Sequence, residues 1–194
     1  MQTLFIVDSD NRTLIKRSFI SPLSVVKDVI SRPFTLYDVL GNSRLGWVDI
    51  SLLNAFEQFE QSLSVHLDIQ CAFTPYGSLS HAFGKAMHFS SLTMPIDKLR
   101  IEAMRSGLFS YIEPGFLSPT WVHAEIDSKP PPMLGPESYA SEVIFLNQAL
   151  SLEPLPLFTK KTEERLLKFQ ASHNIAKTGI TDIQTWKFIK IGSD

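Results

Sequence analysis

The sequence predicts an α+β domain followed by a small all-α domain, and three observations support this. Strand-like and helical segments are mixed over residues 1–127. Several prolines follow within 128–139, where neither a helix nor a sheet interior can continue, because proline lacks the backbone donor. Residues 140–194 then carry only helical patterns. We therefore expect two domains joined by a semi-rigid extended linker.

The first elements are a β-hairpin and a helix. Residues 3–8 and 12–20 are strand-like, and Asp10-Asn11 between them is a turn signal. Apolar residues recur at spacings of three and four over 49–63, which predicts a helix there.

Three more elements complete the first domain. We expect a strand over 65–73 and a short strand over 121–126. Between them, the pattern predicts a helix over 94–107, with Thr93 as its cap and Pro95 in its first turn.

The last third predicts a three-helix bundle. The first helix has an amphipathic face over 143–150. Thr159 is placed to cap the second helix and Thr181 to cap the third, after a Thr178-Gly179 turn.

Composition excludes several classes of protein. With 194 residues and a hydrophobic fraction of 44%, the chain is globular and long enough for one medium and one small domain. The net charge of -2 argues against a nucleic-acid-binding surface. No apolar run is long enough to span a membrane. The single cysteine, Cys71, excludes an intrachain disulfide, and we expect it to be a buried apolar residue.

Three of the five histidines lie in two short segments. His81 and His88 share one segment, and His123 lies in the predicted strand 121–126. Neutral imidazole is the commonest side-chain metal ligand, and a catalytic zinc needs three protein ligands and one open position. Glu125 follows His123 by two residues, so in a strand both project to the same face. It is placed either to act as general base or to orient a ligand.

The histidine segments resemble a known family. Ser80, His81, Gly84 and Ala86 match a Ser-His-x-x-Gly-x-Ala-x-Asp pattern, and Val122-His123 matches a later strand. This pattern marks the zinc D-Ala-D-Ala carboxypeptidases of the VanY-like group, which includes peptidoglycan endopeptidases and phage endolysins.

The resemblance implies a small antiparallel-sheet, zinc peptidase-like domain. Zinc would be held by His81, His88 and His123, with Glu125 as the catalytic residue. The chain departs from the family at His88, where the family has Asp, and between 71 and 78, where it lacks the family's substrate-holding Arg. Three neutral imidazoles still form a known catalytic zinc set. Tyr76 or Lys85 is then the candidate to bind substrate in place of that Arg.

The final 50 or so residues resemble the peptidoglycan-binding repeat of bacterial hydrolases. Five of its motifs occur in order: Leu146-Asn147-Gln148-Ala149-Leu150, Thr162-Glu163, Phe169-Gln170, Thr178-Gly179 and Thr185-Trp186. The resemblance implies that this domain binds peptidoglycan.

Taken together, the two resemblances imply a zinc hydrolase that cleaves peptide bonds of peptidoglycan stem peptides and is anchored to the wall by its C-terminal domain. The alternative is a catalytically inactive wall-binding protein on a degenerate peptidase fold, and a third interpretation is a phage structural or lysis protein. The expected partner is peptidoglycan, with no nucleic acid, no membrane span and no obligate protein partner. Residues 1–8 lack signal-peptide features, so we expect the protein to reach the cell wall by lysis or another route, or with a leader outside this sequence.

Overall fold

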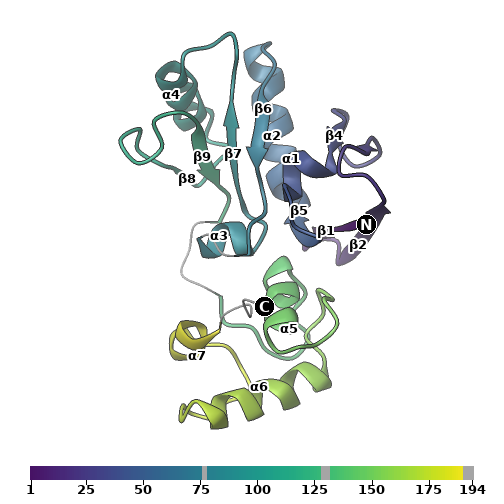
Figure 1. The fold of residues 1–194 in the computed structure, drawn as a ribbon. Coiled ribbons are helices and arrows are strands. Elements are labelled where there is room, and N and C mark those ends of the chain that lie inside the picture. Colours follow the sequence, from purple (N-terminus) through teal and green to yellow (C-terminus); the bar gives the residue numbers. More distant parts are fainter. Residues whose placement is uncertain (76–77, 128–131, 190–194) are drawn as a thin grey trace.

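The computed structural model describes residues 1–75, 78–127 and 132–189. Over these residues it contains seven helices and three small sheets (Figure 1). This mixture confirms the predicted α+β class. None of the described helices is long and apolar enough to cross a membrane.

The first sheet has the strand order β2-β1-β5. β1 (Gln2–Asp8) and β2 (Thr13–Phe19) pair antiparallel, which confirms the predicted hairpin. β5 (Leu45–Asp49) pairs parallel with β1 on the other side. The connection between β2 and β5 holds the short strands β3 (Val25–Val26) and β4 (Phe34–Thr35) and the helix α1 (Leu36–Leu40).

The helix predicted over 49–63 is α2 (Ile50–Leu63), and Asp49 caps it by accepting a hydrogen bond from the Ser51 amide. Its apolar face is fully buried and packs on β1 and β5. On the other side, Phe56 and Phe59 contact Phe89 of the second sheet, with ring centroids 5.6 and 5.7 Å apart. This helix therefore joins the two sheets into one core.

The second sheet is antiparallel with the order β6-β7-β9-β8. Its strands are β6 (Asp68–Cys71), β7 (Ala86–Ser90), β9 (Val122–Glu125) and β8 (Tyr111–Ile112). Two helices accompany it, α3 (Leu79–Ala82) and α4 (Ile96–Ser106). The predicted strands 65–73 and 121–126 are present but shorter than expected.

Two predicted helix caps are wrong by one or two residues. α4 begins after Pro95, which has no side-chain cap bond, while Thr93 bonds to Ser91 in the preceding turn. α7 (Ile183–Phe188) is capped by Asp182, because the Thr181 hydroxyl instead donates to the Pro132 carbonyl. In both places another hydrogen bond competes for the threonine hydroxyl.

The C-terminal part contains α5 (Ser141–Ala149), α6 (Lys160–Ser172) and α7. Thr159 caps α6 through a capping box, as predicted. The buried Gln170 side chain binds the Thr178-Gly179 turn and the Thr185 hydroxyl, with hydrogen bonds of 3.0–3.1 Å. Motifs that are separated in sequence thus meet at one buried amide.

The C-terminal helices pack against the first part of the chain, below α3 in Figure 1. Phe145 of α5 lies 5.4 Å from Phe83 and 6.5 Å from Trp47, and Trp186 of α7 lies 5.3 Å from Phe83. In the predicted linker 128–139, the first four residues lie outside the described part. Beyond them, Leu134 is buried and hydrogen-bonds to Thr181. The domain boundary itself stays a prediction.

Candidate metal centre

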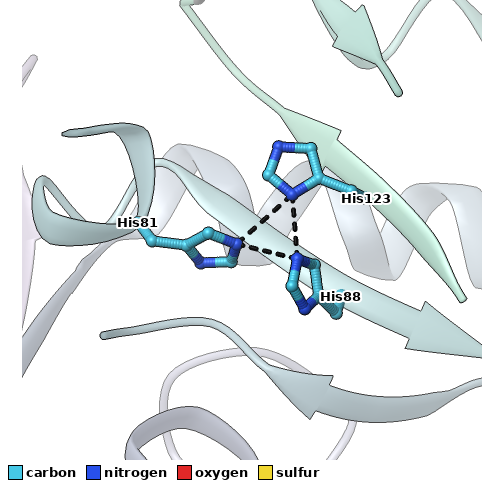
Figure 2. Close-up of side chains that lie close together, drawn as sticks. All are labelled: His81, His88 and His123. Atoms are coloured by element: carbon cyan, nitrogen blue, oxygen red, sulfur yellow. Dashed lines mark hydrogen bonds between the residues drawn. The ribbon is translucent and has the colours of Figure 1, made fainter. Parts of the chain in front are cut away.

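Three elements bring the three histidines of the sequence motif together. His81 lies on α3, whose N-terminus is capped by Ser78. His88 and His123 lie on β7 and β9 and are direct partners in the sheet register. Paired residues project to the same face, so the register alone aligns these two rings. α3 then brings His81 over that face (Figure 2).

Gly84 makes the turn from α3 into β7 possible. Its φ of +71° lies in the left-handed region, which favours glycine. A Cβ at this position would lie 2.6 Å from the Trp47 carbonyl oxygen. The Trp47 indole also donates a hydrogen bond to the Ala82 carbonyl over 2.9 Å. The glycine of the motif is therefore required for β5 to hold the segment that carries His81.

The three rings present one nitrogen each to a common point (Figure 2). His88 Nε2 lies 3.0 Å from His81 Nε2 and 2.9 Å from His123 Nδ1, and the third edge is 3.3 Å. A tetrahedral ion with metal–nitrogen bonds of ~2.0–2.1 Å has nitrogen–nitrogen edges of about 3.3–3.4 Å. Two of the three edges are shorter than this and the third matches it, so small outward movements of His88 would reach the tetrahedral spacing.

The outer nitrogens explain why the inner ones face each other. His81 Nδ1 lies 3.0 Å from the Ala72 carbonyl, and His123 Nε2 lies 2.8 Å from Glu125 Oε1. A carbonyl and a carboxylate accept hydrogen bonds, so both nitrogens carry protons, and in neutral rings the inner nitrogens carry lone pairs. Two lone pairs only 3.3 Å apart repel, and a cation between them converts the repulsion into coordination. The donor set therefore fits a metal ion.

Burial favours the neutral form of His81 and His88. His81 and His123 are buried, and His88 is half-buried beneath Trp121, with ring centroids 5.3 Å apart. Burial, reinforced by the two neighbouring imidazoles, lowers the pKa of His88 to about 3. Burial also lowers the pKa of His81. Neutral rings at ordinary pH are the form that binds a metal.

Glu125 is held by two hydrogen bonds. One joins Oε1 to His123, and the other comes from the Ser80 hydroxyl. Burial raises the pKa of Glu125, but the bonds from His123 and Ser80 outweigh it, so the pKa lies below its usual value. Of the two roles that the sequence left open, these contacts match the orienting one, a carboxylate that fixes the ring and tautomer of a metal ligand. The catalytic role of Glu125 stays a prediction.

The two substrate-binding candidates are placed differently. The Lys85 ammonium lies 2.6 Å from Glu142 Oε1 and 3.2 Å from Asp127 Oδ2, so it joins the strand segment to α5. Burial lowers the pKa of Lys85, but the nearby carboxylates, of which Glu142 has the largest effect, outweigh burial and raise the pKa above its usual value. The amine therefore stays charged. Tyr76 lies outside the described residues.

Sequence reasoning missed the residues that support the cluster from outside. The Ala72 carbonyl carries no side-chain signal, so nothing in the sequence indicates its role. Arg100 is buried and donates to the carbonyls of Ser118 and Trp121 over 2.5 and 3.0 Å, which fixes the chain just before β9. An arginine within the amphipathic pattern of a helix gives no sign of that role in advance.

Comparison with family models, with curated proteins and with solved structures gives no match to this chain.

Proposed function

We propose that the protein is a zinc-dependent hydrolase that cleaves peptide bonds in peptidoglycan stem peptides. The observation that carries the proposal is the convergence of three imidazole nitrogens whose outer nitrogens are bound by Ala72 and Glu125. Three histidines and an open fourth position are a catalytic zinc arrangement. A zinc ion bound there would supply an activated water and polarise the scissile carbonyl.

The peptidase-like assignment of the first part rests on the motif around His81 and His123. The antiparallel sheet and the α3 turn are consistent with the resemblance, because they give three of the motif residues a physical role. Ser80 binds Glu125, Gly84 permits the turn, and His123 pairs with His88.

The chain's charges favour internal peptide bonds over a free C-terminus. A terminal carboxylate is best held by an arginine fork, and none is present between 71 and 78. Lys85 is already paired with Glu142 and Asp127. We therefore propose endopeptidase rather than carboxypeptidase action.

The C-terminal three-helix part would retain the enzyme on its polymeric substrate and raise the effective concentration of stem peptides. This proposal rests on the five ordered motifs between Leu146 and Trp186.

The experiment is digestion of purified sacculi by zinc-loaded and chelator-treated protein. The loaded protein should release stem-peptide fragments, and the treated protein should release none until zinc is restored. Zinc-loaded protein that cleaves neither sacculi nor short stem peptides would contradict the proposal.

A second candidate is a non-catalytic wall-binding protein. The observation that favours it is the ion pairing of Lys85, the cation that the sequence offered for a substrate carboxylate. Protein that sediments with sacculi and binds zinc, yet leaves every peptide bond intact, would support this candidate.

A further inference from the structure

The pairing of β8 with β9 continues to Glu113, which lies opposite His123. β8 pairs Ile112 with Ala124, so in the same register Glu113 falls opposite His123. The Glu113 amide donates to the His123 carbonyl over 3.0 Å, which continues the ladder to this pair. Residues directly opposite one another project to the same face of a sheet. Glu113 therefore lies on the face that carries His88 and His123.

The negative charge of Glu113 acts on His81 of the cluster, and its carboxylate has no hydrogen-bond partner among the described residues. The side chain is half-buried. Burial lowers the pKa of His81, while the negative charges of Glu125 and Glu113 act in the opposite direction, so both carboxylates lie within electrostatic reach of that ring.

The two carboxylates differ in what they are free to do. Glu125 is engaged by His123 and Ser80. A general base must instead reach the water molecule whose proton it abstracts. A carboxylate without a hydrogen bond meets this requirement better than one held by two.

The chain around Glu113 is fixed on both sides. On its N-terminal side, β8 is held by its pairing with β9. After it, Arg100 donates to the Ser118 and Trp121 carbonyls, and a Cβ on Gly115 would lie 2.6 Å from Arg100 Nη1. Because packed and hydrogen-bonded neighbours hold a catalytic group in place, this segment provides a pre-organised position.

We infer that Glu113 is the proton-accepting carboxylate of the histidine cluster, and that Glu125 is a positioning residue that holds His123. The inference rests on the proposed hydrolysis. As water attacks the carbonyl carbon, a C–O bond forms, an O–H bond breaks and the proton passes to Glu113. Glu113 then returns this proton to the leaving nitrogen as the C–N bond breaks, which regenerates the carboxylate.

The experiment compares Glu113→Gln with Glu125→Gln in the full chain, with the exposed Glu153→Gln as the matched control. Zinc affinity is measured by competition with a coloured chelator. Hydrolysis is measured on sacculi and on an activated ester that needs no peptidoglycan recognition. Cobalt is substituted for zinc, and the pH midpoint of its absorption change is recorded.

We expect Glu113→Gln to bind zinc as the native protein does and to lose about 10²-fold or more in rate. We expect Glu125→Gln to weaken zinc binding by about 10–100-fold, as loss of an outer carboxylate does. Native rates in Glu113→Gln would overturn the inference. So would a loss of zinc as large as in Glu125→Gln, because Glu113 would then be a ligand.

The cobalt spectrum separates this inference from the proposed function. If the native protein hydrolyses neither substrate, the proposed hydrolysis fails, and the spectrum still tests the position of Glu113. Removing a nearby negative charge should move the midpoint of Glu113→Gln to lower pH. A midpoint identical to that of the native protein would overturn the placement of Glu113 on the face that carries the cluster.

Discussion

Replacing Phe145 with alanine should cost a large part of the protein's stability. The Phe145 side chain is 3% exposed and lies between Phe83, Trp186 and Trp47, with ring centroids 5.4, 6.2 and 6.5 Å away. Truncating a buried phenylalanine to alanine costs about 3–5 kcal/mol. In a chain of this length each kcal/mol lowers Tm by about 2–4 °C, so the expected fall is roughly 6–20 °C.

The assay is thermal unfolding followed in parallel by far-ultraviolet circular dichroism and tryptophan fluorescence. The control is Phe116→Ala, because Phe116 is 83% exposed and its loss should change the free energy of unfolding by about 0.5 kcal/mol or less. If the C-terminal helices share one core with the sheets, both signals should change together in the native protein. A Tm for Phe145→Ala within the range of the control would refute the described packing of α5.

Three further predictions concern the cluster and the wall. His88→Ala should lose most of the zinc found by elemental analysis, whereas His66→Ala should keep it and His88→Asp should retain a metal; equal zinc contents in the two alanine variants would exclude the assignment. Without metal, the pKa of His88 is lowered from 6.5 to about 3 in the native chain. Between these two pH values the unfolded chain binds a proton that the native chain does not, so the urea midpoint should fall as the pH drops from about 6.5 toward 3. His88→Gln should flatten that fall, and an unchanged slope would contradict it. Chelator-treated full-length protein should still sediment with sacculi, because wall binding is assigned to the C-terminal part, and protein left entirely in the supernatant would remove that role.

The sequence predicted which helices and strands are present better than it predicted where they begin and end. The hairpin and the helix that begins after Asp49 follow from local patterns, and the structure has both. The caps at Thr93 and Thr181 were wrong, because tertiary and turn hydrogen bonds compete for their hydroxyls. A pattern of neighbouring residues does not show which other groups will compete for a hydroxyl.

At the cluster, sequence supplied the ligands but not their surroundings. The seven-residue gap between His81 and His88 has meaning only once a short helix and a strand are joined through the Gly84 turn. Glu113 lies opposite His123 only because of the β8–β9 register. The two residues are ten apart in the sequence, and a loop with prolines and a glycine joins their strands. A register between short strands is set by packing, so a single sequence does not reveal it.

The C-terminal motifs carry a different kind of information from the histidine motif. Gln170 binds the Thr178-Gly179 turn and Thr185, and Asn147 accepts a hydrogen bond from Thr162 over 2.8 Å. The side chains of Gln170, Thr185, Asn147 and Thr162 are almost fully buried, so these residues of the pattern have a role in the fold whether or not the domain binds the wall. The histidine cluster is the opposite case, because three imidazole nitrogens from three separate elements lie within 3.3 Å of one another. The geometry of the histidines itself therefore fits a metal ion, while a ligand of the C-terminal helices must be demonstrated by sedimentation.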